Sequence, residues 1–203
     1  MSFTRPARVV AVATVAIASL ITLPALAHTG ADAGLHHGLA AGFMHPLTGL
    51  DHLAAMVAVG LWSALVARRG ADLLWAPLGF VAMLLVGALM GLAGVQLPAV
   101  EPMIAASLLV LGLLVLTQKR LPALASAALV GVFAVFHGIA HGHELAGEPD
   151  AVLTLAGMVT ATALLHVAGI GLGYALRHAN RWVPRIAGAA VALLGAALLG
   201  GLA

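Results

Sequence analysis

Six apolar stretches dominate this chain of 203 residues, and each is about long enough to cross a membrane. A helix needs roughly 20 residues to span the hydrocarbon core of a bilayer. Only 8% of the residues are charged and 63% are hydrophobic, which leaves too few polar residues to cover a water-soluble core. We therefore predict an all-α fold, a polytopic transmembrane bundle of six helices at about 43–67, 73–94, 101–117, 122–143, 151–176 and 183–202.

The first 27 residues are predicted to form a segment separate from the transmembrane domain. Two arginines precede an apolar run at 9–23, and Ala-Leu-Ala at 25–27 supplies the small residues that a signal peptidase accepts. This pattern is typical of a cleaved secretory signal peptide, which leaves residues 28–203 as the six-helix transmembrane domain. The alternative is an uncleaved additional transmembrane helix. Both versions place His28 outside the cytoplasm.

Lysine and arginine occupy the first, third and fifth connections between the apolar stretches and are missing from the second and fourth. The positive-inside rule places the basic connections in the cytoplasm and the mature N-terminus outside it. Nearby aromatic residues are predicted to anchor the bundle at the membrane interface; they are Trp62, Trp75, Tyr174 and Trp182. The formal net charge of +2 is too small to indicate a nucleic-acid partner.

The motif HPLTGLDH lies near the start of the first apolar stretch. His45 and His52 are seven positions apart, so they share a face if the helix is continuous. Pro46 fits either the start of that helix or a kink in a helix that begins near Leu35. Asp51 is a candidate metal ligand, or an acceptor that fixes the tautomer of the neighbouring histidine. The alternative is a buried hydrogen-bonded pair, although ionisable groups inside a membrane are costly and usually functional.

The motif FHGIAHGHE lies at the end of the fourth apolar stretch. Its spacing places His137, His141 and Glu144 on one helix face, with His143 pointing elsewhere. Two histidines one turn apart with a carboxylate a turn further form a chelating surface for a divalent transition metal. The alternative for Glu144 is an exposed residue at a helix end.

The two motifs are predicted to lie at the same depth. At a rise of about 1.5 Å per residue, His52 and His137 each lie roughly 10 Å from the outer end of their helices. We therefore expect one metal site in the outer third of the bundle. The chain has no cysteine, so its ligands are nitrogen and oxygen. The expected ligand set is His45, Asp51, His52, His137, His141 and Glu144.

Other polar residues are assigned weaker roles. His166 lies roughly 22 Å along its helix, and the spacing leaves two interpretations open: a hydrogen-bonded core residue, or a relay ligand deeper in a pathway. Ser107 and Thr160 are predicted to bond to their own helices. An external fringe of weak cation ligands is also predicted; it comprises His28, Asp32, His36, His37, His143, Glu148 and Asp150.

With these motifs, the signal peptide and six spans, the chain resembles the HupE/UreJ family of nickel/cobalt permeases, whose pattern His-Pro-x-x-Gly-x-Asp-His occurs at 45–52. The resemblance implies a transporter, not an enzyme, that carries Ni²⁺ or Co²⁺ across the bacterial inner membrane and supplies hydrogenase, urease or cobalamin synthesis. We expect no cofactor besides the transported ion; the expected partners are that ion and membrane lipid, and the oligomeric state is left open. The metal-associated positions of the family fall on the six ligands named above. His166 and the amino-terminal histidines are not part of the resemblance.

The expected mechanism is secondary transport. The chain contains no GxxxxGK nucleotide-binding loop, so uptake is expected to use the membrane potential or the protons released when metal binds. Zn²⁺ and Cu²⁺ would compete by intrinsic affinity. The leading alternative is an intramembrane zinc metalloenzyme, although the chain lacks HExxH and Gly-x-Ser-x-Gly motifs. A bis-histidine haem protein is a weaker alternative.

Overall fold

The computed structural model describes residues 38–201, and every regular element in that range is helical. The predicted all-α fold is confirmed. The predicted signal peptide, together with His28, His36 and His37, lies outside the described residues. In chain order the elements are α2 (Leu39–Thr48), α3 (Leu50–Val66), the short 3₁₀ helix η1 (Gly70–Leu73), α4 (Trp75–Leu92), α5 (Val100–Thr117), α6 (Ala123–Glu144), α7 (Ala151–Arg177) and α8 (Trp182–Leu199).

Five candidate membrane spans are long and apolar enough to cross a membrane by themselves: η1 with α4, and each helix from α5 to α8. The sixth candidate is a pair, α2 and α3, which meet at a bend of 85°. The multi-pass bundle is therefore confirmed. The first span is not one continuous helix over 43–67: it begins earlier, at Leu39, and bends inside the first polar motif, which agrees with the alternative of a kink at Pro46.

The break between α2 and α3 occurs at Gly49, which is extended with φ −81° and ψ 114°. Pro46 lies in the last turn of α2 and not at a helix start, and its ring nitrogen has no proton to give to the helix. A continuous helix would bond the His52 N–H to the carbonyl of Thr48. Here it donates instead to the Asp51 carboxylate, at 2.8 Å. The motif therefore supplies its own substitute for the missing helical hydrogen bonds.

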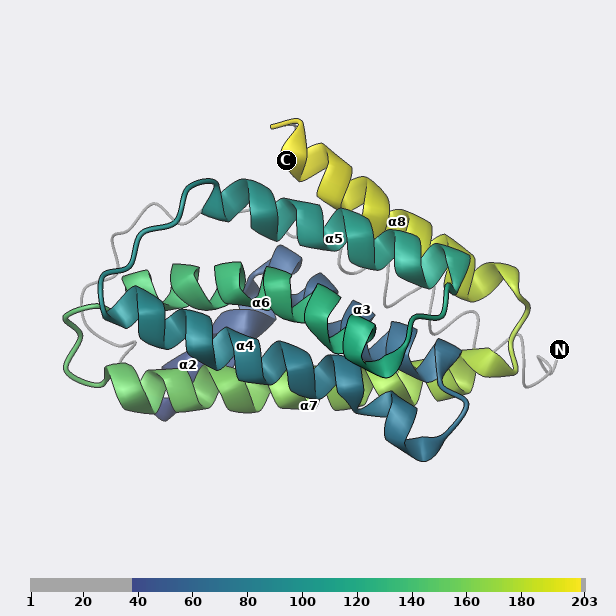
Figure 1. Cartoon of the computed structure of the whole chain (residues 1–203), viewed down its shortest axis with the longest axis horizontal. Coiled ribbons are helices and arrows are strands. Elements are labelled where there is room, and N and C mark those ends of the chain that lie inside the picture. The colour runs from purple at the N-terminus through teal and green to yellow at the C-terminus, as the bar shows by residue number, and fades with distance from the viewer. Residues whose placement is uncertain (1–37, 202–203) are drawn as a thin grey trace, which may run out of the picture. The chain divides into compact units, whose positions relative to one another are not determined.

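The helices pack mainly in pairs, α4 with α6, α5 with α8, and α3 with α7, while α2 also lies against α7 (Figure 1). Small residues allow these backbones to touch. A Cβ added at Gly138 on α6 would collide with the carbonyl oxygen of Leu84 on α4, and one added at Gly60 on α3 would collide with that of His166 on α7. This packing is expected in lipid, where close van der Waals contact replaces the hydrophobic drive.

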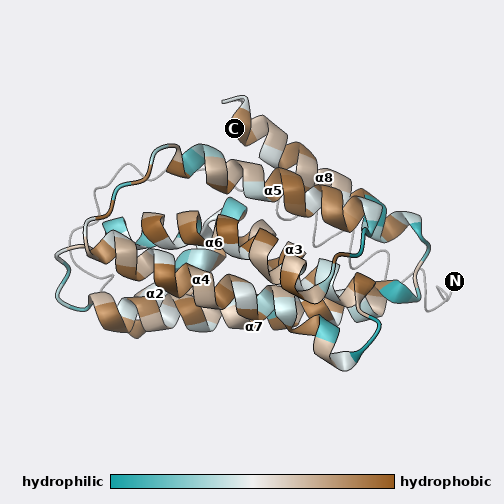
Figure 2. Ribbon diagram, in the orientation of Figure 1, coloured by the Kyte–Doolittle hydropathy of each residue, from teal (hydrophilic) through white to brown (hydrophobic). Residues whose placement is uncertain are grey.

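Successive connections lie at alternate ends of the helices (Figure 1). The connections at 67–74, 118–122 and 178–181 form what we call the basic end, because every lysine and arginine between residues 38 and 201 lies in or beside them. The connections at 93–99 and 145–150 form the acidic end. Figure 2 shows hydrophobic residues along the helices and hydrophilic ones concentrated at the turns.

Side chains tie the helices together at the basic end. The Arg177 guanidinium donates to the carbonyls of Ala64 and Ala67, where α3 ends. The indole of Trp62 donates to the Lys119 carbonyl at 3.0 Å. The interfacial anchor predicted at Trp62 is wrong, because this side chain is buried inside the bundle. The other three predicted anchors are exposed; they are Trp75, Tyr174 and Trp182.

Candidate metal centre

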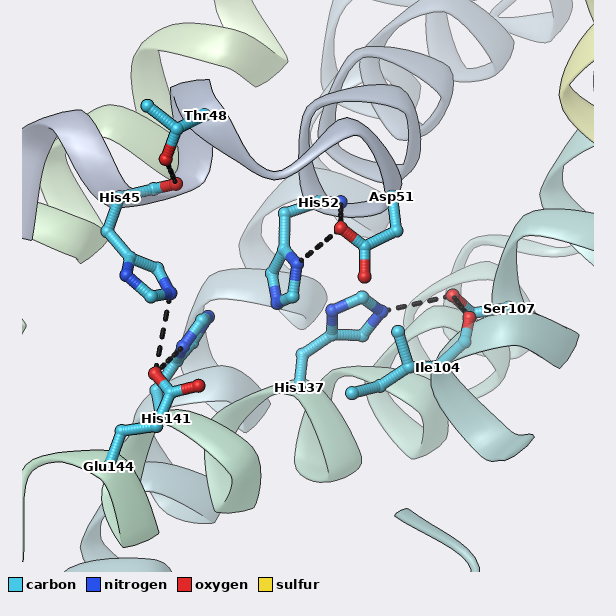
Figure 3. Close-up of polar contacts among 9 residues, drawn as sticks. All are labelled: His45, Thr48, Asp51, His52, Ile104, Ser107, His137, His141 and Glu144. Atoms are coloured by element: carbon cyan, nitrogen blue, oxygen red, sulfur yellow. Dashed lines mark hydrogen bonds and ion pairs between the residues drawn. The ribbon is translucent and has the colours of Figure 1, made fainter. Parts of the chain in front are cut away.

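Both polar motifs contribute side chains to one cluster near the acidic end (Figure 3). Helix α2 supplies the first histidine, α3 the Asp-His pair, and α6 two histidines and a glutamate. The structure thus brings together all six residues predicted from the two motifs; they are His45, Asp51, His52, His137, His141 and Glu144. The route differs from the prediction, since His45 and His52 reach the cluster from two helices and not from one continuous face.

The outer part of the cluster is a triad of two imidazoles and a carboxylate. One oxygen of Glu144, Oε2, lies 3.4 Å from His45 Nε2 and 3.4 Å from His141 Nδ1. One ligand atom from each of these residues falls within 4.8 Å of the other two. Such a set of nitrogen and oxygen donors suits a borderline divalent cation. This triad is therefore a candidate metal-binding site among the described residues.

The inner part of the cluster begins with His52. Its Nδ1 lies 3.0 Å from Asp51 Oδ1. An ionised carboxylate only accepts hydrogen bonds, so Nδ1 carries the proton and Nε2 keeps its lone pair. That Nε2 atom is buried and has no hydrogen-bond partner in the structure. Asp51 thus orients the ring in the way that outer carboxylates orient metal-binding histidines.

His137 is oriented in the same way by a serine on α5. The Ser107 hydroxyl donates to the carbonyl of Ile104 at 2.6 Å, and the same oxygen lies 3.0 Å from His137 Nε2. Because the hydroxyl has a single proton, it accepts from Nε2–H, and the lone pair of His137 is on Nδ1. This Nδ1 atom is also buried without a partner. Two imidazoles of the cluster therefore have a fixed tautomer and a free lone pair.

The four imidazoles form a continuous series. The ring centroid of His52 lies 4.7 Å from that of His141 and 5.0 Å from that of His137, while His45 and His141 are 5.0 Å apart. The rim of the cluster is partly exposed, with 53% for the Glu144 side chain and 31% for His45, whereas the other three histidines are largely or fully buried: His52 at 13%, His141 at 2% and His137 at 0%. The cluster thus leads from a wet rim into the dry interior of the bundle.

An open pocket of about 180 Å³ reaches the cluster from the acidic end of α5 and α8. It contains two carboxylates, Asp51 and Glu101, and its other lining residues are Pro102, Ile104, Ala105, Leu198 and Leu199. Asp51 therefore has two environments, since it bonds His52 and also lines the pocket. This arrangement gives a cation in the pocket access to the carboxylate that orients a buried imidazole.

The remaining predicted residues lie outside the cluster. His166 is buried on α7, against the ring of Phe80. His143 donates to the Val95 carbonyl at 2.9 Å and so points elsewhere, as predicted. Thr160 donates to the Ala156 carbonyl of its own helix, also as predicted. Glu148 and Asp150, in the predicted external fringe, are exposed at the acidic end.

Sequence reasoning missed two residues. Ser107 was expected to bond only its own helix, and it does so, but it also contacts His137. Its depth in the membrane could have predicted this contact. Ser107 lies seven residues into α5 from the acidic end, which is roughly 10 Å deep and level with His52 and His137. Phe80 contacts two of the buried histidines, at ring-centroid distances of 5.6 and 5.3 Å. No polar pattern in the sequence marks it.

Comparison with known proteins identifies the family of the chain. The profile of the HupE / UreJ protein family matches residues 15–198. The chain belongs to the HupE/UreJ family. It is 45% identical over 185 residues to Protein HupE of Rhizobium leguminosarum bv. viciae, covering 89% of this chain and 94% of that protein. No solved structure matches the chain. Family membership and the apolar helices together support a multi-pass membrane protein that acts in metal transport.

Proposed function

We propose that this HupE/UreJ family member is a secondary transporter that imports Ni²⁺, Co²⁺ or both across the bacterial inner membrane. The observation that carries the proposal is the pair of buried, partnerless imidazole nitrogens, Nε2 of His52 and Nδ1 of His137. Buried polar atoms in folded proteins are almost always hydrogen-bonded, so such orphans call for an explanation such as a bound ion. Two oriented lone pairs at the mouth of a membrane bundle suit a cation that passes through.

The donor set supports this choice of ion. Imidazole nitrogen binds nickel, cobalt, copper and zinc well, and the absence of thiolate removes the ligand that most favours soft metals. A transporter must also release its cargo. A site made of neutral imidazoles with carboxylates at its rim binds less permanently than a closed thiolate site. Selection among the divalent ions then depends on geometry and metal supply.

The proposed route runs from the acidic end to the basic end. Cations gather at the carboxylates of the acidic end, among them Glu101 in the pocket and Glu144 on the rim. They then lose water at the buried imidazoles. By the positive-inside rule, the basic end faces the cytoplasm and the acidic end faces the periplasm, with the mature N-terminus. Residues 1–27 are proposed to be the signal peptide that directs this insertion.

The energy for uptake is proposed to come from the membrane potential or from proton release. A membrane potential contributes about 2.3 kcal/mol per elementary charge per 100 mV, and a divalent ion carries two charges. Protons displaced from the rim of the cluster when the metal binds offer a second coupling. Both sources act through the same cluster, so the loss of the cluster should stop uptake under either condition.

The test is uptake of radioactive nickel into proteoliposomes with an inside-negative potential, in competition with unlabelled Co²⁺ and Zn²⁺. We expect time-dependent accumulation that excess Co²⁺ suppresses more strongly than excess Zn²⁺. Equal suppression by both ions would argue for a general divalent carrier, and strong suppression by Zn²⁺ alone would make zinc the substrate.

Two controls accompany this measurement. Protein-free liposomes set the leak, and His52→Ala protein shows that uptake needs the cluster. If the intact protein accumulates no metal above the leak, the transport proposal is overturned. A parallel assay for zinc-dependent hydrolysis of a membrane substrate then tests the remaining alternative.

A further inference from the structure

His166 is a buried polar residue that the outer cluster does not use. It lies on α7 with an exposed fraction of 2%, and neither Nδ1 nor Nε2 has a hydrogen-bond partner. Burying an imidazole without a partner costs free energy, because the ring loses its hydrogen bonds to water. His52 and His137, by contrast, each have one hydrogen bond to a protein side chain. Among the described histidines, His166 is therefore the one with both nitrogens buried and unsatisfied.

Phe80 connects this residue with the outer cluster. Its ring is fully buried on α4, and its centroid lies 5.6 Å from that of His137 and 5.3 Å from that of His166. The two imidazoles are therefore no farther apart than the sum of these distances. Both histidines pack against one aromatic ring that carries no ligand atom.

Helix direction explains how residues at such different depths approach each other. Helix α6 runs toward the acidic end and α7 runs away from it (Figure 1). Side chains lean toward the N-terminus of their helix, so His137 leans inward from the acidic end and His166 leans back toward it. His137 lies roughly 10 Å and His166 roughly 22 Å along the helix axes from the acidic end. The two side chains therefore point toward each other, which reduces the difference in depth between their rings, and both rings contact Phe80.

We propose that Phe80 is a gate in the ion path and that His166 is a second binding station beyond it, for the same imidazole-binding divalent cation. This inference rests on the transport function proposed above. The outer cluster offers several ligand groups to an ion, whereas the inner station offers the single imidazole of His166. An ion therefore binds His166 less tightly than the cluster, which favours its onward passage to the basic end. The Phe80 ring must move aside for each ion, so it keeps the two stations from exchanging freely.

A purely structural role for His166 makes a different prediction. A histidine that only fills space beside an aromatic ring can be replaced by leucine, which has a similar volume and no polar atoms to bury. Such a protein would fold and transport as before. A binding station cannot tolerate leucine, because the metal ligand is lost. His166→Leu therefore separates the two roles.

The experiment measures two quantities on the same purified variants. Equilibrium dialysis with radioactive nickel gives the affinity of the outer cluster, and proteoliposomes give the initial rate of uptake. For His166→Leu we expect uptake to fall at least about tenfold while the affinity stays within about twofold, since the cluster ligands are intact. Normal uptake overturns the second station, and so does an affinity that falls in parallel with uptake.

Phe80→Ala tests the gate by removing the ring. If movement of the ring limits passage, the initial uptake rate should rise at least about threefold with unchanged nickel affinity. A rate equal to or below that of the intact protein overturns the gate. Because removal of a buried ring can destabilise the bundle, Phe80→Leu is measured as well. It keeps apolar bulk, and its rate should lie between those of the intact protein and the alanine variant.

Controls separate this inference from the transport proposal and from misfolding. Met158→Leu is a volume-conserving change at another buried position of α7 and should leave both quantities unchanged. His166→Gln retains a polar side chain if the leucine variant fails to fold, and its uptake should also be low. If the intact protein carries no nickel, the transport proposal itself fails. If the intact protein and His166→Leu carry nickel equally, only the inner station fails.

Discussion

The two motifs build the same cluster with opposite backbones. Helix α6 is an unbroken helix of 22 residues, and its three ligand candidates share a face simply through their spacing. The other motif is divided between α2 and α3 by a bend of 85°, so its two histidines come from different helices. In α6 the ordinary helix does the positioning. In α2 and α3 a break in the helix does it, stabilised by a hydrogen bond from the His52 N–H to the Asp51 carboxylate.

The cluster therefore has one side built on a continuous helix, α6, and one side shaped by the bend between α2 and α3. Helix α6 is fixed by backbone contact with α4 at its glycines. The bend at Gly49 instead exchanges regular helical hydrogen bonds for local ones, and it turns His45 toward Glu144. Non-helical backbone is tolerated at membrane depth where it is buried or faces polar groups.

The largest effect on nickel uptake should come from removing a single ligand, from either of the two motifs. His52→Ala and His137→Ala should each reduce nickel uptake at least about 100-fold, more than is typical for losing an outer-shell partner. The two losses should be equal if both motifs hold the same ion. Uptake into proteoliposomes measures them, and size-exclusion chromatography in detergent confirms that each variant is folded. Normal uptake by either variant would mean that the motifs do not share a site.

Rigidity of α6 should depend on its glycine contacts. A Cβ at Gly138 would collide with the Leu84 carbonyl, so Gly138→Ala should lower the free energy of unfolding by about 1–3 kcal/mol or more. Gly171→Ala is the matched control, because a Cβ there meets nothing within 4 Å. Thermal unfolding in detergent compares the two. Equal melting temperatures would show that α6 is not held by close contact with α4.

Loss of a group that orients one of the two buried rings should have a smaller effect than loss of a metal ligand. Ser107→Ala removes the group that fixes the His137 tautomer, and Asp51→Asn replaces a carboxylate that only accepts hydrogen bonds from His52 with an amide that can also donate. Each should weaken nickel binding by about 10–100-fold, the range typical of outer partners of metal-binding histidines. Equilibrium dialysis provides the measurement. An unchanged affinity in Ser107→Ala would show that His137 keeps its tautomer without the serine.

The smallest effect should come from the bend. Alanine at Gly49 places a Cβ 3.0 Å from Asp51 Oδ1 and 3.4 Å from His52 Nδ1. It also favours continuation of the helix. Because the backbone at this position has a negative φ, the protein should fold, and uptake should fall only about threefold as the carboxylate shifts by a few tenths of an ångström. A loss as large as that of His52→Ala would mean that the bend admits no substituent.

Much of the cluster on α6 was readable from the sequence. Spacing of i, i+4 and i+7 fixes one face of any helix, and no tertiary contact is needed to find it. The bend could not be read in the same way. Pro46 and Gly49 each permit a break, but proline is also common at a helix start, and only the packing of α2 and α3 against α7 decides which occurs. Ser107 and Phe80 come from other helices, so their contacts with His137 depend on how α4, α5 and α6 pair.

Hydrophobic length and helical rise depend only on the order of residues, so the sequence alone predicts a helical membrane protein with two histidine-rich motifs at one depth. The packing of the helices fixes which nitrogen of His137 keeps its lone pair and places one aromatic ring against both His137 and His166. Those features depend on neighbours from other helices, and helix pairing in lipid rests on close contacts between small residues, which are too widespread in this chain to specify partners from sequence alone.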